Sequence, residues 1–168
     1  MNLTPLAAAA LRAELLARAS ADQVARRALP HPPTRADWAR VHAIDSANTA
    51  RMRQVLVVAG WPGYALVGKD GSDAAWLLIQ HGPLDLEEQA LVLLSDAVRR
   101  QDANPRNLAY LTDRVRMYRG QPQLYGTQYR NSELYAVEDP ERLDERRSEV
   151  GLGPHAEYDA LVRGAAPR

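Results

Sequence analysis

The sequence predicts a mainly α protein with six or seven helices in one compact domain and a small β-hairpin. Three observations support this fold class. Apolar residues recur every three or four positions through most of the chain, helix-capping residues stand where these segments begin, and only residues 123–138 alternate as strands do. We expect a helical core at residues 34–164, with residues 1–33 adding an N-terminal helix and a Pro-rich linker packed on the same domain. Residues 165–168 should fray.

Two long helices are predicted in the first third of the chain. The first begins with Thr4 as its N-cap and Pro5 at its first position, and a group of prolines ends it after residue 29. The second begins at Thr34, and Asp37 three residues later makes a near capping box. Gly60 ends this helix, because glycine readily adopts the conformation that closes a helix.

The remaining predicted elements are shorter. A glycine-rich loop at 61–71 precedes a short apolar helix at 72–81, and further helices are expected at 85–100 and from Asn104-Pro105 to Gly120. Strands at 123–129 and 133–137 form the predicted hairpin. Asp139-Pro140 and Pro154 open the last two helices.

Composition excludes several classes of function. The chain has no cysteine, which rules out disulfides, thiolate catalysis and cysteine-ligated zinc. Its formal net charge is zero, so the basic surplus typical of nucleic-acid binders is missing. No apolar stretch reaches the roughly 18 residues of a membrane span, and no basic region precedes the N-terminal apolar run. We expect a cytoplasmic protein that binds neither nucleic acid nor membranes.

The second predicted helix places polar residues on its apolar seam. Spacing of three and four residues joins Trp38, Val41, Asp45, Asn48, Met52, Val55 and Ala59. Asp45 and Asn48 lie in the middle of this seam, one turn apart. An unpaired buried carboxylate costs several kcal/mol, so Asp45 needs a cation, hydrogen-bond donors or water. Asp45 therefore either belongs to a functional site or forms a structural pair, for instance with an arginine.

Two further polar residues are expected to face inward. His81 follows Leu77 by four positions at the end of the apolar helix, so it points with the buried face. It is the strongest candidate for a group that titrates near neutral pH, although such a histidine can also be purely structural. Gln89, three residues after Leu86 and four before Leu93, leans inward as well, as a ligand contact or as a partner for a loop carbonyl.

A third group of candidates lies between residues 113 and 128. Asp113 and Arg114 are adjacent on a helix and so should have different partners, either in a site or in solvent. Gly126 within a predicted strand indicates a close approach of another group or a bulge. Tyr125 and Gln128 beside it either reach a pocket or pack as ordinary strand residues.

No cofactor or metal is expected. His42 and Asp45 are one turn apart, but neither an HExxH motif nor paired histidines support a metal site. The phosphate-binding, dinucleotide-binding, GxSxG and kinase signatures do not occur.

Several short motifs, in this order, resemble a bacterial domain-of-unknown-function family. They are Asp45-x-x-Asn48, Gly60-Trp61-Pro62, Gly68, Gln80-His81, Gln89, the stretch from Ala109 to Arg114, and the Gln-Leu-Tyr-Gly-Thr-Gln block at 123–128. The resemblance spans about Trp38 to Leu152 and leaves the first helix out. It implies that the inward polar residues belong to one recurrent site, but it implies no reaction.

Two hypotheses of function follow. In the first, the chain is a small non-redox enzyme that performs hydrolysis, cyclisation or elimination on a polar small molecule. His81 would be the general acid or base, Asp45 would orient it or stabilise its charge, and Arg114 would bind an anionic group. The substrate would be held by Asn48, Gln89, Asp113, Tyr125 and Gln128. Convergence on one pocket is expected for Asp45, Asn48, His81, Arg114, Tyr125 and Gln128. In the second hypothesis the chain is a non-catalytic binding or interaction domain whose polar cluster is structural. The sequence predicts no oligomeric state.

Overall fold

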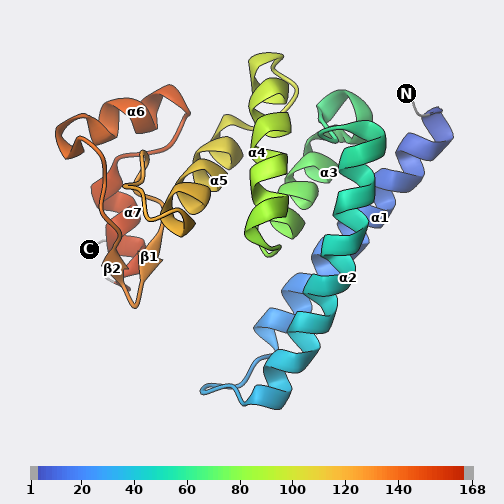
Figure 1. The fold of residues 1–168 in the computed structure, drawn as a ribbon, viewed down its shortest axis with the longest axis horizontal. Coiled ribbons are helices and arrows are strands. Elements are labelled where there is room, and N and C mark those ends of the chain that lie inside the picture. The colour runs from blue at the N-terminus through green and yellow to red at the C-terminus, as the bar shows by residue number, and fades with distance from the viewer. Residues whose placement is uncertain (1–3, 165–168) are drawn as a thin grey trace. The chain divides into compact units, whose positions relative to one another are not determined.

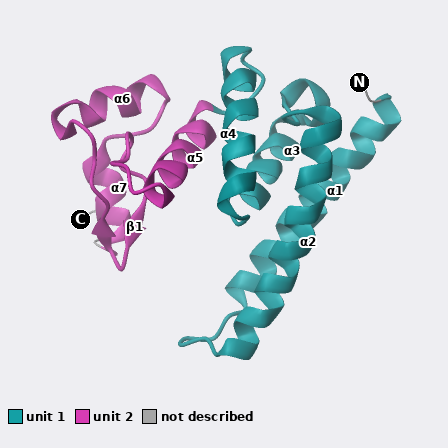
Figure 2. Ribbon diagram, viewed as in Figure 1, with its two compact units in different colours: residues 1–104 teal, residues 105–168 magenta. Residues whose placement is uncertain are grey.

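A computed structural model describes residues 4–164, so the predicted frayed tail at 165–168 lies outside the described residues. Within this range the chain forms seven α-helices, one short 3-10 helix and one two-stranded antiparallel sheet, which confirms the mainly α prediction (Figure 1). It divides into two compact units, residues 1–104 and 105–168 (Figure 2). None of the described helices is both long and apolar enough to cross a membrane.

Unit 1, residues 1–104, holds four helices. They are α1 (Pro5–Arg27), α2 (Arg35–Ala59), α3 (Tyr64–Ile79) and α4 (Leu84–Arg99). Helix α1 runs antiparallel to α2, and it packs against both α2 and α3 (Figure 1). Its buried positions recur every three or four residues and comprise Leu11, Leu15, Ala19, Asp22 and Ala25. One of the five is a carboxylate, and the polar site of unit 1 is built around it.

Local capping signals place the first two helices correctly. The Thr4 hydroxyl accepts a hydrogen bond from the Ala7 amide, and Pro5 occupies the first turn of α1. At the start of α2, Thr34 and Asp37 form the full reciprocal capping box. Helix α2 ends at Ala59, with Gly60 at a φ of 68° as its C-cap.

Helix α3 begins earlier than the sequence predicts. The loop expected at 61–71 contains a helical turn from Tyr64, which is joined to the main helix through a kink at Gly68 with φ 71° and ψ 172°. Asp102 caps this turn from a distant part of unit 1. Its carbonyl accepts from the Tyr64 amide at 2.8 Å, and its carboxylate accepts from the Ala65 amide at 2.7 Å. The helix start depends on this tertiary contact, which local sequence does not reveal.

Unit 2, residues 105–168, combines short helices with an extended loop. Its elements are α5 (Pro105–Tyr118), β1 (Tyr129–Arg130), β2 (Glu133–Leu134), η1 (Pro140–Arg142), α6 (Leu143–Glu149) and α7 (His155–Val162). The hairpin is present but much shorter than expected, with Tyr129 paired to Leu134 and Arg130 paired to Glu133. In the rest of the predicted strand at 123–129, Gln123 makes an isolated parallel bridge with Val137, and residues 124–128 form a loop that side chains hold in place.

Candidate functional site

In unit 1 a buried carboxylate lies beside His81. Asp22 is only 1% exposed, and its Oδ1 lies 3.1 Å from Nδ1 of His81. The imidazole follows the C-terminal end of α3, while Asp22 comes from the buried face of α1. A carboxylate accepts hydrogen bonds, so it favours the tautomer with a proton on Nδ1 and the lone pair on Nε2. Asp22 thereby orients the histidine and selects its tautomer.

Arg26 joins this pair to Asp45. Its Nε contacts both oxygens of Asp22 at 3.2 and 3.3 Å, and its Nη2 donates to Oδ1 of Asp45 at 2.5 Å. Arg26 is one turn after Asp22 on α1, whereas Asp45 comes from the seam of α2. We call Asp22, Arg26, Asp45 and His81 the Asp22 cluster. Of the alternatives left open for Asp45, namely a cation, hydrogen-bond donors or water, the structure provides a cation, Arg26.

Asn48 continues the polar contact between α1 and α2. It is buried, and its Oδ1 accepts from Arg18 at 3.2 Å. Its amide nitrogen has no hydrogen-bond partner among the described residues. Arg18 also binds Glu14, so a chain of polar contacts leads along α1 away from the cluster. The predicted inward orientation of both Asp45 and Asn48 is confirmed.

His81 and Asp45 line an open groove of about 530 Å³. The side chains of both are partly exposed there, at 18% and 19%. The groove, which we call the His81 groove, is lined by His42, Asp45, Ser46, Thr49, Ala50, Arg53, His81 and Pro83. Arg53 is ion-paired with Asp85 at 2.6 Å. A polar small molecule entering this groove would meet hydroxyl groups, a carboxylate and an imidazole.

The environment of His81 favours its uncharged form. Burial lowers the pKa of His81 below its ordinary value and is the largest cause, and the charge of Arg26 acts in the same direction. Asp22 and Asp45 oppose this shift but do not reverse it. An imidazole that stays uncharged near neutral pH can accept a proton, as general-base chemistry requires.

The same residues include a set of atoms suited to a metal ion. Asp22, Asp45 and His81 each offer one ligand atom, and these atoms lie within 4.8 Å of one another. Two carboxylates and one imidazole form a donor set that zinc and other transition metals accept. Arg26, however, donates to both carboxylates of this set. The cluster thus already contains a cation that compensates part of its negative charge.

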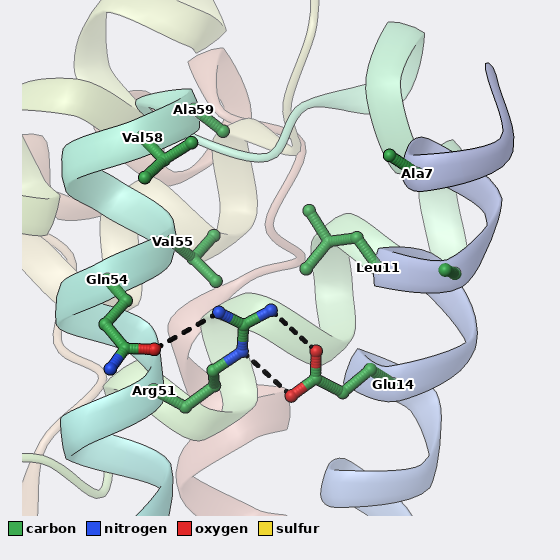
Figure 3. A pocket seen from close by; sticks show the side chains of 9 residues that line it. Ala7, Leu11, Glu14, Arg51, Gln54, Val55, Val58 and Ala59 are labelled. Atoms are coloured by element: carbon green, nitrogen blue, oxygen red, sulfur yellow. Dashed lines mark hydrogen bonds and ion pairs between the residues drawn. The ribbon is translucent and has the colours of Figure 1, made fainter. Parts of the chain in front are cut away.

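A second cavity in unit 1 differs in character. It measures about 290 Å³ between α1 and α2 and is lined mainly by alanine, leucine and valine side chains (Figure 3). Its charged residues are bonded to each other, since Arg51 donates to Glu14 at 2.8 and 2.7 Å. This ion pair lowers the pKa of Glu14 to about 2. An acid that stays ionised and paired does not supply proton transfer, so we place the candidate site in the His81 groove.

The remaining candidates lie in unit 2, where Asp113 organises a loop. Asp113 is 0% exposed, and its carboxylate accepts from the amides of Leu124, Tyr125 and Thr127 at 2.6 to 3.1 Å. The Thr127 hydroxyl donates to it at 2.9 Å. Burial nevertheless raises the pKa of Asp113, against the effect of these four donors. The alternative in which Asp113 is a solvated surface charge is wrong.

The other predicted residues of unit 2 have partners close by. Arg114 lies over the Tyr118 ring, 5.5 Å from its centroid, so it and Asp113 have different partners as expected. Gln128 donates through its side chain to the Thr127 hydroxyl at 3.0 Å, and the Tyr125 carbonyl accepts from Arg147. Three of the six residues expected to converge are in unit 1 and three are in unit 2. Their convergence on one pocket stays a prediction.

Gln89 differs from its expected orientation. It is exposed on α4, whose buried residues are Leu86, Glu87, Ala90, Leu94 and Ala97. The inward orientation expected for Gln89 depends on Leu93 belonging to the buried stripe. The helix instead buries Leu94, and this rotation carries Gln89 toward solvent.

Sequence reasoning missed Asp22 and Arg26, and in unit 2 it missed Gln123 and Arg147. Gln123 is buried and bonds the backbone of Gln128 and Tyr135, while Arg147 is buried and donates to two carbonyls. A signal existed for Asp22, because it shares the 3–4 spacing of Leu11, Leu15 and Ala19. The test that found Asp45 on α2 would have found Asp22 on α1.

Comparison with known proteins identifies a family but no individual relative. Neither the curated proteins nor the solved structures contain a match. Residues 9–167 match the family described as "Family of unknown function (DUF6624)". The match includes most of α1, which the resemblance seen in the sequence left out, and so it includes Asp22 and Arg26. Because the match covers nearly the whole chain, the protein belongs to the DUF6624 family, a family of unknown function.

Proposed function

We propose that this chain is a small enzyme that performs non-redox acid–base chemistry on a polar small molecule in the His81 groove. The observation that carries the proposal is the contact between Nδ1 of His81 and the buried carboxylate of Asp22. His81 also lines an open groove. A carboxylate behind an imidazole holds its tautomer and stabilises the imidazolium that forms when Nε2 accepts a proton. Hydrolysis, cyclisation and elimination can each use this step.

The other groove residues supply contacts for a substrate. Asp45 accepts from Arg26 through one oxygen and lines the groove, and Ser46 and Thr49 add hydroxyl groups from the same helix. In this proposal Asp22 takes the orienting role that the sequence analysis gave to Asp45. Asp45 in turn binds the substrate or stabilises charge. The anion-binding role of Arg114 stays a prediction.

The proposal can be tested before the substrate is known. The purified protein is incubated with a deproteinised bacterial metabolite extract, and the change in every detectable mass is followed with time. We expect the wild-type protein to consume at least one metabolite, and His81→Gln to slow this consumption by about 100-fold or more. His31→Gln is the matched control, because His31 is an exposed histidine that does not line this groove. It should retain activity within a few-fold.

The second hypothesis, a non-catalytic domain with a structural polar cluster, predicts a different outcome. All charges of the Asp22 cluster have partners within it, as a structural network requires. If metabolite levels stay unchanged with wild-type protein, or change equally with His81→Gln, the enzyme proposal is refuted. A metabolite retained by the wild-type protein but not turned over would support a binding domain.

A further inference from the structure

Two carboxylates face one imidazole in the Asp22 cluster, and a guanidinium lies between the carboxylates. Nε of Arg26 contacts Asp22, and Nη2 of the same side chain contacts Asp45. These two nitrogens belong to one rigid plane, so Arg26 sets the separation of the two carboxylates as well as neutralising part of their charge. A lysine could supply the charge but not this two-sided geometry.

Charge balance shows why a cation is needed here. Asp22 is almost fully buried and Asp45 is only partly exposed, so their mutual repulsion is poorly screened by water. The basic residue of α1 beside the two carboxylates is Arg26. On α2, His42 and Arg53 line the adjoining groove. Arg53 is engaged by Asp85 of α4. Arg26 is therefore the cation that the structure places in direct contact with both carboxylates.

The three ligand atoms of Asp22, Asp45 and His81 form the kind of set that binds a divalent metal ion. We propose that Arg26 is the resident cation of this set: it occupies the place of a metal ion, holds Asp22 against His81, and so keeps the groove metal-free. This inference deepens the proposed function and rests on it, because it makes His81 an acid–base group rather than a metal ligand. Arg26 is then a positioning residue that acts through Asp22 and Asp45.

The first test is a gain of metal affinity. Zinc is titrated into the wild-type chain and into Arg26→Gln, with binding followed by calorimetry and native mass spectrometry. Removing one positive charge a few ångströms from a divalent ion should tighten zinc binding by roughly tenfold or more. Adding Asp45→Asn or His81→Gln to Arg26→Gln should abolish the gain. Arg27→Gln is the matched control, since Arg27 is the exposed neighbour on the same helix and should bind zinc as the wild type does.

The second test determines the tautomer of the His81 imidazole without any metal or substrate. Nitrogen-15 chemical shifts of the four histidines report which ring nitrogen carries the proton. We expect a predominantly Nδ1-protonated His81 in the wild type and in Arg27→Gln, and a mixture of tautomers in Arg26→Gln. Arg26→Lys keeps the positive charge, so it should exclude zinc. Its fraction of Nδ1-protonated His81 should lie between those of the wild type and Arg26→Gln. Circular dichroism establishes that each variant is folded.

Each outcome decides the matter. Tight binding of one zinc ion by the wild type, lost in Asp45→Asn, would show that metal displaces Arg26 and would overturn the proposal. So would an Arg26→Gln variant that gains no zinc affinity and keeps the wild-type tautomer. If Arg26→Gln does not fold, the wild-type titration and Arg26→Lys still decide, because zinc binding at this site by either one refutes the proposal. Neither measurement uses a substrate, so their failure is distinct from a failure of the metabolite assay.

Discussion

Asp22 in unit 1 and Asp113 in unit 2 are carboxylates of equal burial, and the fold uses them differently. Asp22 accepts from side chains that can themselves titrate or move, namely His81, Arg26 and Gln23. Asp113 accepts from three backbone amides and one hydroxyl, all within residues 124–127. Backbone amides cannot change their positions without moving the chain, so their hydrogen bonds to Asp113 fix the path of the loop. The contact with His81 beside a groove makes Asp22 part of a candidate site.

This contrast indicates how a buried acid can be assigned to structure or to chemistry. Burial alone does not separate the two cases, because both residues are at most 1% exposed. The decisive features are the type of donor and the presence of solvent-accessible space beside it.

The largest effect is expected for Asp113→Ala. The substitution leaves three backbone amides without their acceptor in a partly buried loop, and each orphaned group costs roughly 1–3 kcal/mol. We expect the free energy of unfolding to fall by about 3–5 kcal/mol, measured by urea denaturation. Glu141→Ala, an exposed acid in the same unit, should change it by less than about 0.5 kcal/mol. A loss below about 1 kcal/mol for Asp113→Ala would remove its assignment as the loop anchor.

A smaller effect is expected for Asp22→Ala. Arg26 keeps Asp45 as a partner and His81 is partly exposed to the groove, so the donors released from Asp22 can be satisfied again. We expect a loss of about 1–3 kcal/mol in the free energy of unfolding. The activity of the proposed enzyme should fall far more than this stability change suggests. If Asp22→Ala is as destabilising as Asp113→Ala and ligand binding is unaffected, the distinction between the two carboxylates fails.

The smallest effect concerns the pH dependence of stability through His81. Burial lowers the pKa of His81 in the folded state, so the unfolded chain binds a proton more readily as the pH falls below about 6.5. The contribution of His81 is therefore fully present above this pH and declines as the pH falls toward the folded-state pKa. Comparing the free energy of unfolding at pH 7.5 and 5.5 should show a steeper acid loss for the wild type than for His81→Gln. An equal loss in both proteins would mean that the folded state does not lower this pKa.

His155 and Asp113 titrate as well, which is why the difference between the wild type and His81→Gln is the quantity to measure. Burial lowers the pKa of His155, and this group weakens the fold on acidification in the same way. The raised pKa of Asp113 has the opposite sign, because the folded state then holds a proton that the unfolded state has released. Both contributions are common to the two proteins and cancel in the comparison.

Much of the helical framework could be predicted from local patterns. The caps at Thr4 and Thr34, the end of α2 at Gly60 and the start of α5 at Pro105 depend on neighbouring residues alone. The early start of α3 could not be predicted, because Asp102 supplies its cap from 37 residues away. The long strands expected at 123–137 were wrong for a similar reason. Asp113 and Gln123 bind the loop amides that a longer strand would have paired.

By itself the sequence determined the class of fold, the caps of the long helices and the inward orientation of Asp45, Asn48 and His81, because each follows from spacing along one helix. Only the tertiary structure decided the partners. It brought Asp22 of α1 to His81, placed Arg26 against Asp45, and wrapped residues 124–127 around Asp113. The physical reason is that a buried charge must be compensated, but the compensating group can come from any element that packs against it.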